Sequence, residues 1–139
     1  MVLAGCGSAT VAQLPPAAGP ARAVATLGDG RRVELLGRER VVELLDGGRR
    51  VATAPAGIGP TAIACLERRW CYVADARGDA VLVYAVGDSI ELTRRYRLAG
   101  APRAIAVDRR RRRLLVTLGA GGRRVELVAH GRPHRLRMT

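Results

Sequence analysis

The sequence contains three cysteines, and a thiol can form a disulfide, ligate a metal or carry a lipid. Cys65 and Cys71 flank a short stretch between two apolar runs, so we expect them to face each other across a hairpin. Outside the cytoplasm this pair can form a disulfide, and the alternative is two small buried thiols; the hairpin pattern leaves both open. Together with Cys6 their spacing matches no familiar zinc framework, so we expect no metal site.

One stretch of the chain is dense in guanidinium groups that could bind an anion: Arg109, Arg110, Arg111, Arg112 and Arg113. The alternative is a solvated hairpin tip, because the matching stretch of the preceding repeat, Leu66–Arg69, is also basic. The formal net charge of +12 arises from arginine without any lysine, which is typical of a GC-rich coding bias and weakens charge as evidence for a partner. Aromatic residues make up only 3% of the chain, which disfavours a nucleic-acid partner that needs a stacking platform.

Histidines and carboxylates, the usual acid–base groups, form no catalytic pattern. The spacing of His130 and His134 suits a metal only on a helix, and Gly131 and Pro133 disfavour a helix there, so we expect both histidines on the surface. The 12 acidic residues are scattered, and neither a Gly-x-Ser-x-Gly elbow nor a Gly-x-x-x-x-Gly-Lys loop occurs. The sequence therefore predicts no enzyme activity, no metal and no cofactor.

The elements that carry these groups are short Val-rich runs separated by Gly, Asp and Arg, which is typical of antiparallel strands joined by hairpins. A pattern beginning at Pro60 recurs at Pro102, and a weaker copy contains Ala23, so the repeat is about 40 residues long. We expect repeats at about 21–59, 60–101 and 102–139, with strands at 22–26, 31–36, 40–45, 49–54, 61–65, 70–76, 80–86, 91–98, 103–108, 114–118, 124–129 and 134–138. The predicted fold is all-β: a partial β-propeller of about three four-stranded antiparallel blades.

The composition of the strands fits this architecture. Blades pack face to face, so both faces of a central strand are buried, and near-continuous apolar runs such as Ala80–Ala85 are favoured. The small strand around Ala62-Ile63-Ala64 is expected innermost, where the blades converge. A propeller typically has four to eight blades, so three repeats predict open, apolar end faces. We therefore expect a truncated product or a fragment of a larger propeller, and the alternative is self-association through these faces to complete a ring.

The first residues resemble the lipobox of bacterial lipoproteins. Leu3-Ala4-Gly5-Cys6 matches the box, and the resemblance implies that the Cys6 thiol is the site of lipid attachment. Only five residues precede Cys6, too few for an export signal, so residues 1–20 are expected to be a truncated signal and a flexible Pro/Ala tether. The implied location is extracytoplasmic, with a lipid anchor in the membrane.

The middle repeat resembles the YVTN-type propeller repeats of bacterial surface proteins. The matching residues are Tyr72-Val73-Ala74-Asp75 and then Asp79-Ala80-Val81-Leu82-Val83. The third repeat keeps Leu115-Val116-Thr117 and Val125-Glu126-Leu127 but has Leu118 at the polar position, and the first keeps only Val42-Glu43-Leu44 well. The resemblance covers most of 20–139 and implies a propeller.

These observations favour a non-enzymatic, extracytoplasmic binding or scaffold module whose ligand is a protein, a glycan or a small molecule. One alternative is a fragment of a propeller hydrolase or lactonase whose catalytic ligands lie on other blades. Another is a protein that binds anions or nucleic acid through its Arg-rich hairpin tips.

Overall fold

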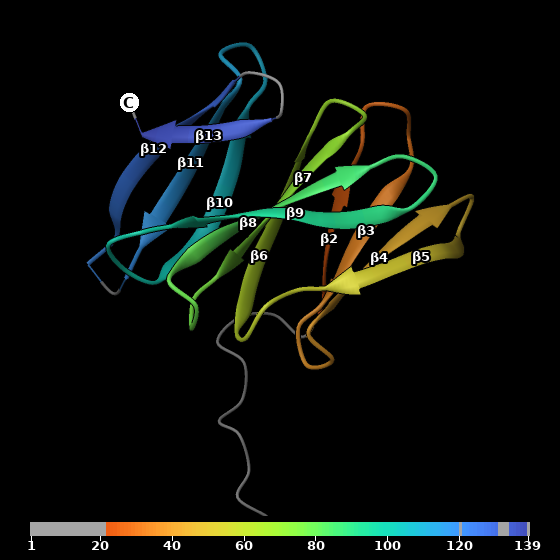
Figure 1. The fold of residues 1–139 in the computed structure, drawn as a ribbon, viewed down its shortest axis with the longest axis horizontal. Coiled ribbons are helices and arrows are strands. Elements are labelled where there is room, and N and C mark those ends of the chain that lie inside the picture. The colour runs from red at the N-terminus through yellow and green to blue at the C-terminus, as the bar shows by residue number, and fades with distance from the viewer. Residues whose placement is uncertain (1–21, 120, 131–133, 139) are drawn as a thin grey trace, which may run out of the picture.

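The computed structural model describes residues 22–119, 121–130 and 134–138, which form three four-stranded antiparallel sheets (Figure 1). In each sheet the strands follow one another in chain order. The strands are β2 (Arg22–Thr26), β3 (Arg32–Leu36), β4 (Val41–Asp46) and β5 (Arg49–Pro55) in the N-terminal sheet, β6 (Pro60–Leu66), β7 (Trp70–Asp75), β8 (Ala80–Val86) and β9 (Ile90–Arg97) in the middle sheet, and β10 (Pro102–Asp108), β11 (Arg113–Leu118), β12 (Arg123–His130) and β13 (Arg135–Met138) in the C-terminal sheet.

The all-β prediction is confirmed, and each of the three predicted repeats corresponds to one sheet. The described residues contain no helix, and so none that is long and apolar enough to cross a membrane. The strand bounds agree with the sequence pattern within one or two residues, because Gly, Asp and Arg clusters interrupt the apolar runs at each turn.

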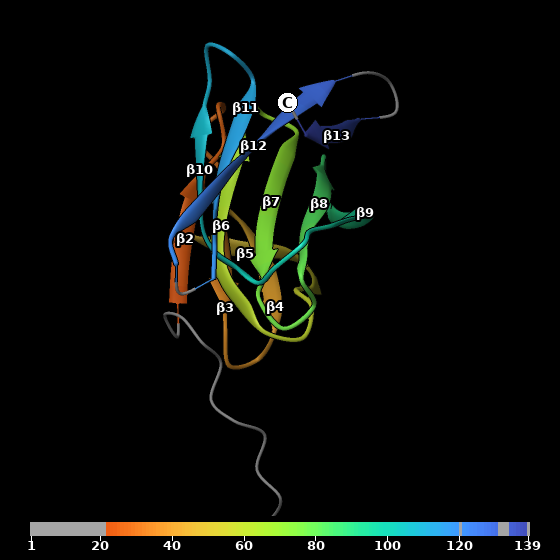
Figure 2. The same cartoon turned by 90° about the vertical axis from the view of Figure 1, so that its left-hand side faces the viewer.

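The first strands of the three sheets lie side by side, with β6 between β2 and β10. In Figure 2 these strands run along one edge of the molecule, and β9 and β13 lie towards the opposite edge. The hydroxyl of Thr61 in β6 donates a hydrogen bond to the carbonyl of Pro102 in β10 over 3.1 Å. The small side chains of β6 therefore suit an inner position, where neighbouring sheets approach closely.

Two apolar cores lie between the sheets. The first joins the N-terminal and middle sheets, and its larger members include Val33, Leu35, Val42, Leu44, Val73, Leu82 and Tyr84. The second joins the middle and C-terminal sheets, and its larger members include Leu66, Tyr72, Val81, Val83, Leu114, Val116 and Leu127. Leu82 thus enters one core while its neighbours Val81 and Val83 enter the other, as the pleat of a strand requires.

The connectors between sheets share one pattern of backbone hydrogen bonds. In the first connector, Ala56 donates to the carbonyl of Arg40, and Ala76 donates to the carbonyl of Gly59. In the second connector, Leu98 donates to Asp79, and Gly119 donates to Ala101 in the same way. Each connector is therefore bonded to a hairpin turn of the sheet before it and to a turn of the sheet after it.

The outward faces of the two end sheets are mixed rather than apolar. Glu34 pairs with Arg22 at 3.4 Å, and Glu43 pairs with Arg50 at 3.1 Å, on the N-terminal sheet. On the C-terminal sheet Arg113 pairs with Glu126 at 2.8 Å. This corrects the expectation of apolar end faces, because each Glu occupies the outward position of a Val-Glu-Leu strand whose other side enters a core.

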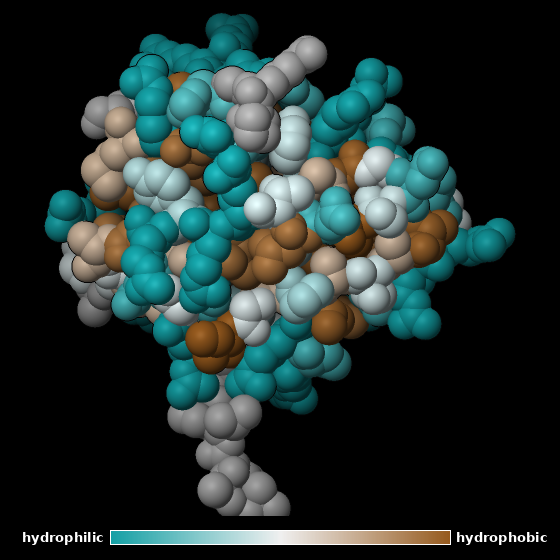
Figure 3. Space-filling view, viewed as in Figure 1, coloured by the Kyte–Doolittle hydropathy of each residue, from teal (hydrophilic) through white to brown (hydrophobic). Residues whose placement is uncertain are grey.

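The broad face that carries the outer strands β5 and β9 shows apolar patches between charged side chains (Figure 3). Val51 in β5 and Leu92 in β9 are 45% and 39% exposed. Isolated apolar residues of this kind are normal on a protein surface, so they do not mark a site by themselves.

Candidate binding cleft on the hairpin rim

Three hairpin loops, 27–31, 67–69 and 109–112, lie together at one end of the sheets, and we call them the hairpin rim. The middle loop holds the other two. The backbone N–H of Gly28 donates to the carbonyl of Glu67 over 2.6 Å, and the Glu67 carboxylate pairs with Arg112. The rim is thus a continuous surface assembled from all three repeats.

A disulfide closes the base of the middle loop. Cys65 and Cys71 are opposite each other in β6 and β7, and their sulfurs are bonded, with Cα atoms 4.0 Å apart. Of the two alternatives left open by the sequence, the structure contains the disulfide. Both residues are buried against the N-terminal sheet, so the bond anchors the 67–69 loop to the first core.

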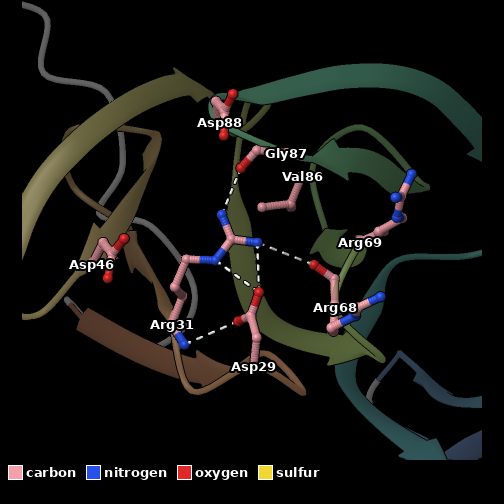
Figure 4. Close-up of a pocket in the computed structure, with 8 residues that line it drawn as sticks. All are labelled: Asp29, Arg31, Asp46, Arg68, Arg69, Val86, Gly87 and Asp88. Atoms are coloured by element: carbon pink, nitrogen blue, oxygen red, sulfur yellow. Dashed lines mark hydrogen bonds and ion pairs between the residues drawn. The ribbon is translucent and has the colours of Figure 1, made fainter.

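A cleft of about 600 Å³ opens on the rim between the N-terminal and middle sheets (Figure 4). Loops from both sheets contribute to its walls. The lining residues are Asp29, Arg31, Asp46, Arg68, Arg69, Val86, Gly87 and Asp88. Apart from Val86 and Gly87 every lining residue is charged, so the cleft suits a polar ligand or partner.

Arg31 organises the centre of this cleft (Figure 4). Its guanidinium donates to Asp29 through Nε at 3.0 Å, to the Gly87 carbonyl at 2.5 Å and to the Arg68 carbonyl at 3.4 Å. The hydrogen bond from the Arg31 side chain lowers the pKa of the Asp29 carboxyl, because it stabilises the charged form of this group. The pair spans both sheets, so its role is to position the loops.

Four other charged side chains of the cleft are engaged in no hydrogen bond or ion pair with described residues: Arg68, Arg69, Asp46 and Asp88. The two arginines come from the disulfide-anchored loop, Asp46 is the last residue of β4, and Asp88 lies in the turn between β8 and β9. In Figure 4 the arginines and the aspartates lie on different sides of Arg31. The cleft therefore presents separate basic and acidic walls to a partner.

The arginine run predicted to bind anions is divided by the structure. Arg113 is the first residue of β11 and pairs with Glu126 on the outward face. Arg111 contacts Asp108 at 4.0 Å, and Arg112 pairs with Glu67. Arg109 and Arg110 are exposed at the tip and make no ion pair with described residues. Only part of the run is thus available to a partner on the rim.

His134 corrects a sequence expectation. It is 4% exposed rather than superficial, because its ring packs against Trp70 with the centroids 4.0 Å apart. His130 is partly exposed in β12. No group of His, Cys, Asp or Glu among the described residues is arranged to hold a metal ion.

Asp75 is a polar residue whose role the sequence pattern understated. The sequence places it in a turn that it could itself stabilise, and it does accept a bond from the Gly78 N–H at 3.2 Å. It also accepts bonds from Ile58 at 3.2 Å and Gly59 at 2.8 Å, in the connector from the preceding sheet. Gly57 is in the left-handed region at φ 89°, directly against the Asp75 carboxylate. Asp75 therefore joins two sheets.

The predicted lipidation site Cys6 and the tether at 1–20 lie outside the described residues.

Comparisons with known proteins identify the architecture only. No protein-family model and no curated protein matches the chain. A functionally unknown protein from Desulfotomaculum acetoxidans DSM 771 is similar in structure, with TM-score 0.67 and 16% identity, over 85% of this chain and 40% of that chain. Hydrazine synthase from Kuenenia stuttgartiensis is similar with TM-score 0.69 and 14% identity, over 99% and 38%. The chain thus shares its arrangement of sheets with proteins of which it spans about two fifths.

Proposed function

We propose that the three sheets are consecutive blades of a β-propeller and that the chain is a non-enzymatic binding module. The observation that carries this proposal is the hairpin rim, where loops of all three repeats are bonded into one surface that contains a charged cleft. The repeated four-stranded sheets and the shared connector pattern support the propeller, since both connectors make the same type of backbone bond to the sheet before and the sheet after.

The rim favours a partner that carries carboxylate or sulfate groups. Arg68 and Arg69 in the cleft and Arg109 and Arg110 at the next loop have guanidinium groups without ion-pair partners among the described residues. Arg31, by contrast, is neutralised by Asp29. Guanidinium groups recognise oxyanions such as carboxylate and sulfate through paired hydrogen bonds, so the partner we infer is an acidic protein segment or an acidic glycan.

The test is binding of two probes, poly-L-glutamate and heparin, to the full chain by calorimetry. We expect at least one probe to bind, with an affinity that falls about tenfold or more when Arg68 and Arg69 are both replaced by Ala. The matched control replaces Arg94 and Arg97, which are exposed on β9 away from the rim loops, with Ala. The control has the same net charge and should keep the affinity within about twofold.

Two results would overturn this proposal. One is an equal loss of affinity in the rim and control variants, because that would mean attraction by net charge alone. The other is tighter binding of duplex DNA than of either probe, because that would assign the rim to nucleic acid.

We also propose an extracytoplasmic location with a lipid anchor at Cys6. The support is the lipobox resemblance together with the Cys65–Cys71 bond, since disulfides persist in oxidising compartments. Trapping thiols with an alkylating agent while intact cells are lysed in denaturant, followed by mass spectrometry, tests it. We expect Cys65 and Cys71 to resist alkylation until they are reduced; rapid alkylation without reduction would contradict the proposed location.

A further inference from the structure

His134 lies between the middle and C-terminal sheets, immediately before the outer strand β13. Its ring is stacked on Trp70 with an angle of 11° between the planes, and its Nε2 is 2.5 Å from the hydroxyl of Tyr72. Both aromatic residues belong to β7 of the middle sheet. His134 is therefore a contact through which β13 reaches the neighbouring sheet.

The surroundings of His134 favour a neutral imidazole, because the side chain is almost fully buried and a buried charge is costly. Burial raises the pKa of Tyr72 above its ordinary value, so its hydroxyl stays protonated and uncharged beside Nε2. The other charged and titratable groups facing this cluster are Arg112 and Glu67 on the rim and His130 on β12. Burial first, then the positive charges of Arg112 and His130, lower the pKa of His134 to about 4.

Strand β13 has few other attachments. It is four residues long, and among the described strands it pairs only with β12; of its side chains Leu136 enters the second core. We propose that His134 is an acid-sensitive latch: while neutral it holds β13 against the middle sheet, and when it gains a proton β13 is released. Release would uncover the edge of β12 and the Trp70 side of the interface, while the rest of the two cores stays packed.

The direction of the pH effect follows from linkage. An exposed imidazole in the released strand has a pKa near 6.5, above the value of about 4 in the closed state. The latch is therefore at full strength above pH about 6.5 and weakens as the pH falls through the window down to about 4. At pH 5 these two values make opening about 30-fold more favourable than at pH 7.5.

The test uses the full chain with its disulfide intact, and Trp70, the single tryptophan, is the reporter. Hydrogen exchange of the β13 amides, corrected for the intrinsic effect of pH, should show about 30-fold less protection at pH 5 than at pH 7.5. The β6–β8 amides should change far less. The Trp70 fluorescence should follow the same transition.

Two variants separate the latch from general acid sensitivity. His134→Phe keeps an aromatic ring against Trp70 but cannot gain a proton, so it should remove the transition between pH 6.5 and 4. His130→Asn alters the only other histidine and should keep it. A transition that survives in His134→Phe would overturn the proposal. The proposal would also be overturned if the fluorescence of the unaltered chain changed while its β13 amides kept their protection. This second result does not depend on whether His134→Phe folds.

Discussion

The middle sheet and the two end sheets differ in how their strands distribute apolar residues. In β8 of the middle sheet every residue from Ala80 to Tyr84 is buried, because each side of the sheet faces a core. In the matching strand β4, Val42 and Leu44 are buried, whereas Glu43 lies between them on the outward face. The two patterns show that the number of covered faces, rather than strand position, determines whether the residues alternate.

The sheets differ also at the end of the second strand. Asp75 ends β7, is fully buried, and accepts hydrogen bonds from a connector. Leu118 ends β11 at the equivalent position and enters the second core instead. A polar anchor and an apolar one thus occupy the same place in successive repeats, and their loss should have different consequences.

The largest expected effect is in the doubly covered strand. Leu82→Ala removes a side chain with 0% exposure from the first core, and we expect it to lower the free energy of unfolding by about 3–4 kcal/mol. Leu115→Ala is the matched change on the partly exposed outward side of the C-terminal sheet, and its cost should stay below about 1.5 kcal/mol. Urea unfolding measures both. Equal losses would contradict the comparison of covered and open faces.

The polar anchor should rank next. Asp75→Ala leaves the N–H groups of Ile58, Gly59 and Gly78 without their acceptor, and we expect a loss of about 2–3 kcal/mol in urea unfolding. Asp108→Ala, which removes a partly exposed carboxylate from the C-terminal sheet, is the control and should cost about 0.5 kcal/mol. A similar, small effect of both changes would mean that the connector is held without Asp75.

The disulfide is a further difference between repeats, since Val107 and Leu114 face each other where the middle sheet has Cys65 and Cys71. Replacing both cysteines with Ala should lower the free energy of unfolding by about 2 kcal/mol, the value for a short closed loop. Unfolding is measured with and without a dithiol reductant. The reductant should lower the free energy of unfolding of the unaltered chain but not that of the variant. Unchanged stability of the unaltered chain after reduction would contradict this expectation.

The smallest effect on stability is expected on an outward face. Changing both Glu34 and Glu43 to Leu breaks two surface ion pairs and should alter the free energy of unfolding by less than about 1 kcal/mol. It also converts a mixed face into an apolar one, so sedimentation velocity should show larger oligomers. Glu91→Leu on β9 is the control and should sediment like the unaltered chain. If the double variant sediments like the unaltered chain, these carboxylates do not limit association.

Local patterns were sufficient to predict the strands. Ala80–Val86 agrees at both ends, and Trp70 begins β7 as expected, because apolar runs of this length between turn residues have few alternatives. The pairing of Cys65 with Cys71 also follows from a short hairpin, since the loop length sets which residues are opposite.

Contacts between distant segments were not predictable in this way. His134 is buried because Trp70 and Tyr72 of another sheet cover it, and no feature of its own neighbours indicates that. The Arg31–Asp29 pair could be recognised as a local turn interaction, but its bonds to Gly87 and Arg68 depend on how two sheets stack. The division of the arginine run likewise required the positions of Glu67 and Glu126.

The repeated connector bonds have an evolutionary consequence. Ala56 and Leu98 make the same type of contact with the hairpin behind them, and Gly59 and Ala101 make the same type with the hairpin ahead. A gene segment copied in frame from one connector to the next would encode a whole sheet together with the residues that bond it to the sheets before and after it. The copy could therefore insert without sequence changes in the neighbouring sheets. Ancestral chains could therefore have changed in length by whole units.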